Sequence, residues 1–255
     1  MKKFIAFALV LVMALGLLAG CGSNKGMTLE EGKLIMSTNA AFPPYEMEDD
    51  NGNYIGIDVE GAQAIADKLG LELVIDNMEF TAALEAAQKG KSDMVMAGVT
   101  VNEDRLAVMD FSDSYATGIQ VVIVKEGSDV TMDNLGEKMI GTQMGTTGYI
   151  YASDTIENGG YGEDHVIAYD NGITAVQALL NDQIDAVIID NAPAQAFVAE
   201  NPGLTLLDGE WALENYAIGF AKGNTELVEA VNEALAELIA DGTVQSIIDK
   251  YIPAE

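Results

Sequence analysis

From Lys33 onward the chain alternates short β-rich runs with amphipathic helical stretches, and this alternation restricts the possible fold more than any other feature. The first round predicts strands at 34–38, 71–75 and 94–97 and helices at 58–69 and 81–88. Gly70 follows the first helix and is a usual helix stop. Alternation of this kind is typical of an α/β architecture with mainly parallel strands.

A second round of the same kind begins after Lys125. It predicts strands at 139–142, 166–169 and 186–189, with helices at 147–153 and 173–180, and the chain ends in helices at 225–240 and 244–251. The last long helix carries apolar residues at helical spacing, such as Leu227, Val231 and Leu238. Two rounds in the same order predict two lobes built on one plan, although any two helix-turn-strand units share some likeness.

Two extended apolar runs, Gly118–Val124 and Tyr216–Ala221, join the rounds. If the second lobe is inserted into the first, the chain crosses out and back along these runs, which then form a two-strand hinge. We therefore expect residues 33–118 and 217–255 to form lobe 1, and residues 119–216 to form lobe 2.

The N-terminus has the form of an export signal. Lys2 and Lys3 precede an apolar run from Phe4 to Leu18, which is shorter than the roughly 20 residues that a membrane span needs. Residues 18–21, Leu-Ala-Gly-Cys, resemble the processing box of bacterial lipoproteins, which implies removal of residues 1–20 and a lipid on Cys21. An idle cysteine beyond an ordinary cleavage site is the alternative. Residues 21–32 are expected to form the lipidated N-terminus and a linker.

These features predict an exported protein that is lipid-anchored at the outer face of the cytoplasmic membrane, facing the periplasm or the cell surface. Cys21 is the one cysteine, so an internal disulfide is excluded. The formal net charge of −29 makes nucleic acid an improbable partner. An acidic surface of this kind is common for solubility and says little about the ligand.

Polar and aromatic residues follow the predicted strands, where ligands bind in open parallel sheets. Arg105 offers a planar fork that matches a carboxylate. Thr146 and Thr147 precede a helix whose free N–H groups favour an anion, and Asp190 can pair with an ammonium. One cation, one anion, hydroxyl groups and aromatic rings form the set that a zwitterion requires.

At these residues the chain resembles solute-binding protein family 3, the polar amino-acid-binding proteins of ABC importers. The resemblance covers about 33–251 and rests on motifs in the family's order at 39–46 (Asn-Ala-Ala-Phe-Pro-Pro-Tyr-Glu), 56–59, 97–105, 110–115 and 141–148. It implies a type II periplasmic-binding-protein-like fold, in which two α/β lobes enclose a ligand cleft. It also implies a free L-amino acid as ligand and the permease subunits in the membrane as partners.

The resemblance assigns roles to individual positions. Arg105 would bind the ligand α-carboxylate, with Thr100, Thr146 and Thr147, and Asp190 would bind the α-ammonium. The Gly98 carbonyl and the Thr100 hydroxyl would assist Asp190. The remaining implied site residues are the turn residue Ala97, the aromatic walls Phe42 and Phe80, and Asn39, Glu46 and Gln143 facing the ligand side chain.

Each assignment has a structural alternative. Arg105 could form a surface ion pair with Glu103 or Asp104, Asp190 could cap the helix that starts near Pro193, and the two phenylalanines could be ordinary core residues. The single histidine, His165, has no neighbours that suggest a metal site, and neither a metal nor a cofactor is expected.

Specificity depends on one departure from the family pattern. Relatives that take cationic side chains often carry Asp where this chain has Asn39, and Glu46 is the candidate for supplying the missing charge. The ligand is therefore expected to be cationic, such as arginine or lysine, or polar, such as glutamine.

Two other function classes use the same scaffold. An enzyme resembling cyclohexadienyl or arogenate dehydratases would need a poised acid in the cleft, and Glu46 is the one candidate. A sensor module would need a separate signalling partner. Of these classes, the sequence favours a monomeric, non-enzymatic binding protein.

Overall fold

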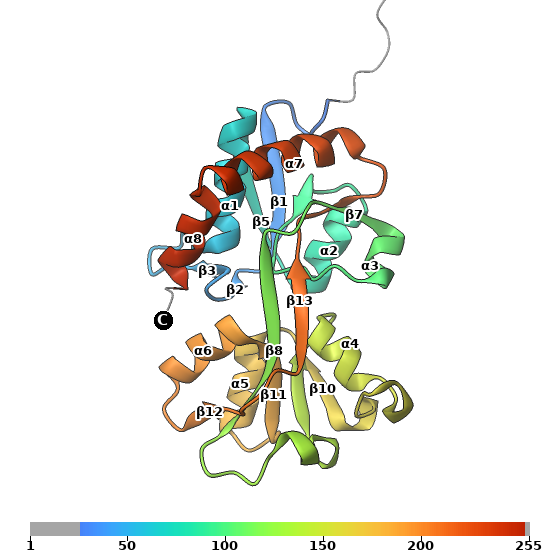
Figure 1. Cartoon of the computed structure of the whole chain (residues 1–255), viewed down its shortest axis with the longest axis vertical. Helices are drawn as coiled ribbons and strands as arrows, with labels where there is room; N and C mark the ends of the chain where they lie inside the picture. The colour runs from blue at the N-terminus through green and yellow to red at the C-terminus, as the bar shows by residue number, and fades with distance from the viewer. Residues whose placement is uncertain (1–25, 253–255) are drawn as a thin grey trace, which may run out of the picture.

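The computed structural model describes residues 26–252, and the chain forms two lobes, each around its own β-sheet (Figure 1). The sheet of lobe 1 has the order β5-β1-β6-β14-β7. Its strands are β1 (Lys33–Thr38), β5 (Glu72–Asn77), β6 (Met94–Val95), β7 (Met109–Phe111) and β14 (Gly219–Ala221). β1 runs parallel to β5 and β6, whereas β14 is antiparallel to β6 and β7.

Among residues 26–252, five α-helices belong to lobe 1. They are α1 (Ile57–Leu69), α2 (Phe80–Gln88), α3 (Glu103–Val108), α7 (Thr225–Ala240) and α8 (Thr243–Tyr251). α1 ends at Gly70, whose φ of 69° is in the left-handed region that glycine tolerates. α7 buries Leu227, Val231 and Leu238 along one face, as its apolar spacing predicts, and packs against α1.

The second sheet has the order β10-β9-β11-β8-β12, and β13 also pairs with β8. Its strands are β8 (Ala116–Lys125), β9 (Ile140–Gln143), β10 (Val166–Tyr169), β11 (Ala186–Asp190), β12 (Leu204–Leu206) and β13 (Ala212–Tyr216). The helices of this lobe are α4 (Thr147–Ser153), α5 (Gly172–Leu180) and α6 (Asn191–Glu200). Three short 3-10 helices occupy Met132–Glu137, Ile156–Asn158 and Glu163–His165.

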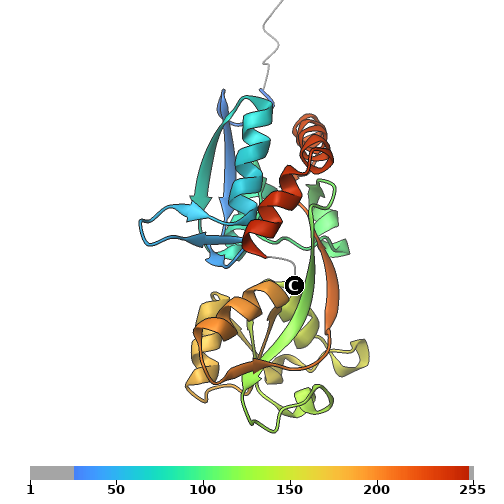
Figure 2. The same ribbon diagram turned by 60° about the vertical axis from the view of Figure 1, so that its left-hand side comes forward.

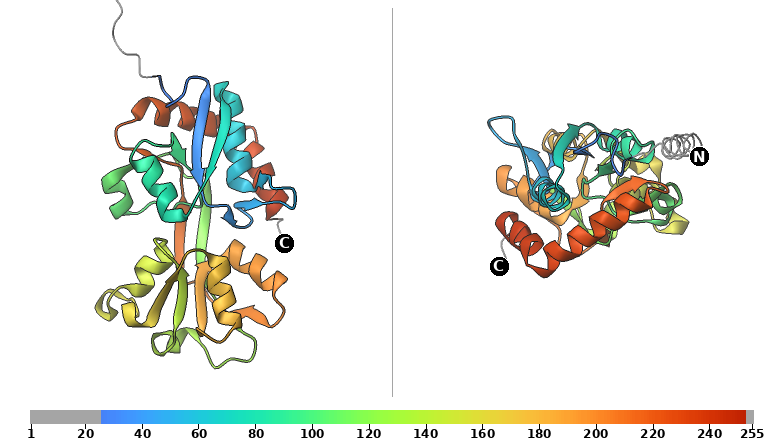
Figure 3. Two further views of the ribbon diagram at one scale, coloured as in Figure 1. Left: turned by 180° about the vertical axis from the view of Figure 1, so that it is seen from behind. Right: turned by 90° about the horizontal axis from the view of Figure 1, so that it is seen from above.

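Two strands join the lobes. β8 and β13 run antiparallel, from the pair Tyr216–Ala116 to the pair Ala212–Gln120, and Figure 2 shows them side by side along one edge of the molecule. The lobe 2 helices lie around their sheet below this connection (Figure 3). The type II architecture with two lobes is thus confirmed. The first crossing strand, β8, lies at the expected run Gly118–Val124, whereas the second, β13, precedes the expected run Tyr216–Ala221 and shares only Tyr216 with it.

Local differences from the expected pattern have physical causes. The run Tyr216–Ala221 is split, because β13 ends at Tyr216 and β14 begins at Gly219 in the other sheet. A small sheet of β2 (Ala41–Phe42), β3 (Glu46–Glu48) and β4 (Tyr54–Ile55) was not expected, since its strands are too short to show a periodic pattern.

The N-terminal predictions fall largely outside the described residues. The export signal at 1–20 and the lipidated Cys21 lie in the part of the chain before residue 26. Within the expected linker, Met27 already packs against the core of lobe 1, and the N–H of Leu29 donates to Asp93 at 2.7 Å. Contacts with the lobe therefore begin before Lys33. Within 26–252, no helix is both long and apolar enough to cross a bilayer.

Candidate functional site

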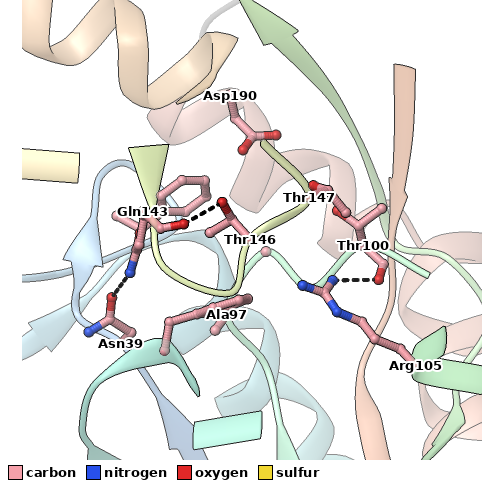
Figure 4. Close-up of a pocket in the computed structure, with 11 residues that line it drawn as sticks. Asn39, Ala97, Thr100, Arg105, Gln143, Thr146, Thr147 and Asp190 are labelled. Carbon is pink, nitrogen blue, oxygen red and sulfur yellow. Dashed lines mark hydrogen bonds between the residues drawn. The ribbon is translucent and has the colours of Figure 1, made fainter. Parts of the chain in front are cut away.

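A cavity lies between the lobes, and residues from both lobes line it (Figure 4). The lining consists of Asn39, Phe42, Phe80, Ala97, Gly98, Thr100, Arg105, Gln143, Thr146, Thr147 and Asp190. Asn39 follows β1, Gln143 ends β9 and Asp190 ends β11, so the carboxyl ends of strands from both sheets meet here. Eleven of the twelve positions implied by the family resemblance come together in this cavity.

Arg105 lies in α3, and the side chain of Asn102 caps this helix by accepting from the Arg105 N–H at 2.9 Å. Its guanidinium donates from Nη1 to the carbonyl of Thr100 at 2.7 Å and from Nη2 to the carbonyl of Gly145 at 3.1 Å. The Cζ atom lies 5.6 Å from the centroid of the Phe80 ring. Burial lowers the pKa of Arg105, and the nearby charge of Glu214 opposes this shift.

The ion pair of Arg105 with Glu103 or Asp104 does not form within residues 26–252. Arg105 is 8% exposed, and Figure 4 shows its guanidinium directed into the cavity rather than to the surface. A buried cation without an acidic partner is costly unless an anion joins it. The arrangement can therefore accept a ligand carboxylate.

Asp190 holds the opposite charge. Its Oδ2 accepts from Nε2 of Gln120 at 2.8 Å, and its Oδ1 accepts from the hydroxyl of Tyr216. Burial, and then the neighbouring charge of Glu214, raises the pKa of Asp190 to about 7. Asp190 occupies the N-cap position of α6, but its side chain makes no capping hydrogen bond. The carboxylate is thus available to an ammonium group in the cavity.

Two aromatic rings form walls. Phe42 is 8% exposed and Phe80 is 6% exposed, so both are packed on their outer sides as core residues would be, yet both line the cavity. Gly98, with a φ of 54°, allows Phe42 to approach, since a Cβ at Gly98 would lie 2.8 Å from Cε1 of that ring. Glycine is therefore favoured at position 98 for two reasons, the left-handed backbone and the close approach of the Phe42 ring.

Asn39 and Gln143 lie together at the end of the cavity away from Arg105 (Figure 4). Nε2 of Gln143 donates to Oδ1 of Asn39 at 2.9 Å, across the cleft, and also to the carbonyl of Asp170 at 3.3 Å. Nδ2 of Asn39 donates to the carbonyl of Met78 at 2.9 Å. Both N–H groups of the Gln143 amide are engaged by the protein, so its amide oxygen can accept from a ligand side chain, whereas Asn39 uses one of its two N–H groups and can still donate with the other.

Thr146 and Thr147 lie at the start of α4. The hydroxyl of Thr146 donates to the carbonyl of Gln143 at 2.8 Å and accepts from the N–H of Tyr149 at 3.3 Å. These bonds fix the turn that carries Gly145, whose added Cβ would lie 2.5 Å from Thr81 of lobe 1. The two lobes are thus in close contact at this point.

Glu46 is the position that the structure places apart from the other eleven. Its side chain is 1% exposed, lies near Asp58 and does not line the cavity. Both carboxyl oxygens lack a hydrogen-bond partner within the described part of the chain. Burial, then the charge of Asp58, raises the pKa of Glu46 well above its ordinary value. Its carboxyl lies in the interior of lobe 1, outside the cavity where a charge for a cationic side chain was expected.

Three residues of the hinge strands were missed. Gln120 lies on β8, and Glu214 and Tyr216 lie on β13; all three are buried and bond to residues that line the cavity. Gly118 makes room for Tyr216, because a Cβ there would lie 2.3 Å from the tyrosine oxygen. The available signal was a polar residue within a short apolar run, as in Gly-Ile-Gln-Val-Val at 118–122.

No cluster of metal-ligating side chains occurs among residues 26–252. His165 lies in a 3-10 helix, where Nδ1 is 3.4 Å from the carbonyl of Lys138.

Two α/β lobes, two crossing strands and an enclosed polar cavity define a type II ligand-binding protein. A family model for bacterial extracellular solute-binding proteins, family 3, matches residues 34–254, so the chain belongs to that family. The L-cystine-binding protein TcyJ of Escherichia coli (strain K12) is 31% identical over 259 residues, covering 97% of this chain and 96% of the relative.

Solved structures give the same result. An ancestral arginine-binding protein bound to arginine matches with a TM-score of 0.80 at 38% identity, covering 87% of this chain and 98% of that one. An ancestral arginine-binding protein bound to glutamine matches with a TM-score of 0.81 at 37% identity, covering 88% and 100%. The relatives are named as binding proteins, and the family is extracellular.

Proposed function

We propose that this protein is the substrate-binding component of an amino-acid ABC importer and captures a free L-amino acid between its lobes. The observation that carries the proposal is the meeting of Arg105 from lobe 1 and Asp190 from lobe 2 at one cavity. A guanidinium and a carboxylate in a shared, buried site match the α-carboxylate and α-ammonium of a zwitterion. The relatives that bind amino acids support this reading.

The ligand side chain extends between Phe42 and Phe80 toward Asn39 and Gln143. The acceptor at that end favours a side chain that carries N–H donors, as arginine, lysine and glutamine do. Asp190 is the one carboxylate lining the cavity among the described residues, so a cationic side chain would be held by hydrogen bonds and aromatic faces rather than by an ion pair. This chemistry agrees with relatives bound to arginine and to glutamine.

Binding is coupled to closure of the hinge formed by β8 and β13. The amino acid docks on lobe 1 through Arg105 and Thr100, and lobe 2 closes over it with Asp190 and Thr146. A ligand favours the closed form only by its additional contacts there. The closed form is then recognised by the permease, and Cys21 carries the lipid that keeps the monomeric protein at the membrane.

A thermal-shift screen of residues 26–255 against the common amino acids tests the proposal. A ligand at about 100 times its dissociation constant should stabilise the fold by about 2.7 kcal/mol. We expect arginine, lysine or glutamine to give the largest shift and to be recovered unchanged. A screen in which no amino acid raises the melting temperature contradicts the function, and turnover of the ligand would indicate an enzyme.

A further inference from the structure

A buried carboxylate, Glu214, lies behind the ammonium end of the cavity and does not line it. It is 4% exposed, on hinge strand β13 opposite Gly118 of β8. Its Oε2 accepts two hydrogen bonds, from Oγ1 of Thr100 at 3.0 Å and from Nε2 of Gln120 at 3.0 Å. Thr100 belongs to lobe 1 and lines the cavity, so one carboxylate oxygen links a ligand-site residue to the hinge.

The bond to Thr100 fixes the chemical character of that hydroxyl. A threonine hydroxyl has one hydrogen to donate and two lone pairs. Since the hydrogen is directed at Glu214, the oxygen that faces the cavity acts as an acceptor. An α-ammonium, which has three donors, is the ligand group that an acceptor in this position suits.

The bond to Gln120 orients a second group. Both hydrogens of its amide nitrogen are directed at carboxylates, one at Glu214 and the other at Oδ2 of Asp190, 2.8 Å away. The reversed amide would place its oxygen against two carboxylates, which is repulsive. Gln120 is 1% exposed, so water does not compensate for a wrong orientation. The Gln120 amide thereby orients the carboxylate of Asp190 at the cavity.

We propose that Glu214 is a positioning residue that makes the site selective for an α-ammonium, by holding Thr100 as an acceptor and aiming Gln120 at Asp190. The inference rests on the proposed amino-acid-binding function and adds to it a residue that does not touch the ligand. The site should discriminate against ligands that carry a hydroxyl in place of the α-ammonium, because a hydroxyl has one donor and no charge. A site built around fixed buried partners discriminates strongly against an analogue that leaves them unpaired.

The test compares two ligands with the same side chain. The probes are L-arginine and the α-hydroxy acid that carries the arginine side chain, with L-glutamine and its hydroxy analogue if the parent prefers glutamine. Calorimetric titration of the full-length chain in mild detergent gives both dissociation constants, and their ratio measures selectivity. A residue that only supports the fold would change both constants by the same factor and leave the ratio unchanged.

Glu214→Leu removes the acceptor and should lower the ratio of the two dissociation constants at least about tenfold, the effect of one hydrogen bond to a charged group. Glu214→Gln keeps an acceptor oxygen but loses the charge, so its ratio should fall by a smaller factor. Glu210→Gln, an exposed position just before β13, is the matched control and should keep the parent ratio.

An unchanged ratio in Glu214→Leu overturns the proposal, as does a control that changes the ratio equally. If Glu214→Leu does not fold, an unchanged ratio in Glu214→Gln overturns it instead. A parent protein that binds none of the amino acids overturns the proposed function as well, whereas a parent that binds them while both Glu214 variants keep its ratio leaves that function standing.

Discussion

The guanidinium of Arg105 donates from Nη2 to the carbonyl oxygen of Gly145, 3.1 Å away on the opposite lobe. This bond and the contact between Gln143 and Asn39 join the two lobes at both ends of the cavity. The same guanidinium that is proposed to hold the ligand carboxylate thus also contacts lobe 2. The proposed function thus assigns ligand capture and closure to one side chain, which is the only arginine of the sequence.

Replacing Arg105 by lysine tests this shared role. Lysine keeps the charge but loses the planar fork, so it cannot hold a carboxylate and contact both Thr100 and Gly145. We expect the amino-acid affinity to fall about tenfold to a hundredfold, as the loss of one charge-assisted hydrogen bond implies. Calorimetric titration measures the change, with Lys222→Arg on the surface as control. An Arg105→Lys variant that binds as tightly as the parent contradicts the assignment.

The raised pKa of Asp190 predicts that binding depends on pH. An ammonium pairs with the ionised carboxylate, whereas below a pKa of about 7 the ligand-free site holds a proton that binding must release. Affinity should therefore rise with pH up to about 7, by at most about tenfold per pH unit, and then level off. Titrations at several pH values, in buffers of different ionisation enthalpy, count the released protons.

The same shift has the opposite effect on the ligand-free fold. Because the folded chain binds more protons than the unfolded chain between the ordinary pKa of Asp190, near 4, and about 7, this contribution to stability decreases as pH rises through that window. Asp190→Asn should remove both effects. A variant that retains the full pH dependence of binding would assign it to another group, such as Asp58, whose pKa burial raises to about 6.

Glu46→Gln tests whether the carboxyl of Glu46 contributes to selectivity for a cationic ligand side chain. The sequence suggested that Glu46 supplies a charge to a cationic ligand, but its side chain is buried outside the cavity and burial favours its neutral form. Glutamine has nearly the same shape and no charge. We therefore expect the affinities for arginine and glutamine to change by the same small factor, less than about threefold. A loss confined to arginine would restore the ion-pair role.

Sequence reasoning found the cavity because most of its residues lie in short motifs directly after strands. Asn39, Gln143 and Asp190 each have a local position that indicates where they point once a parallel sheet is assumed. Glu46 was misplaced because β3 forms a short hairpin with β2, and this hairpin turns the Glu46 side chain into the lobe.

The hinge residues could not be found in this way. Gln120 and Glu214 are 94 positions apart, and their hydrogen bond exists only because β8 pairs with β13. Neither residue lies in a motif, and each taken alone is a polar residue in an extended run. Long-range strand pairing is the part of the fold that local patterns do not encode.

The most direct test of the zwitterion site is a calorimetric titration of residues 26–255 with L-arginine and with agmatine, which has the same side chain and no α-carboxylate. L-Lysine and cadaverine, and L-glutamine and 4-aminobutanamide, form the equivalent pairs. The account predicts one-to-one binding of at least one amino acid and a loss of affinity of a hundredfold or more for its decarboxylated partner, since two buried hydrogen bonds to a charged group are lost. Equal affinity for an amino acid and its decarboxylated partner would contradict it.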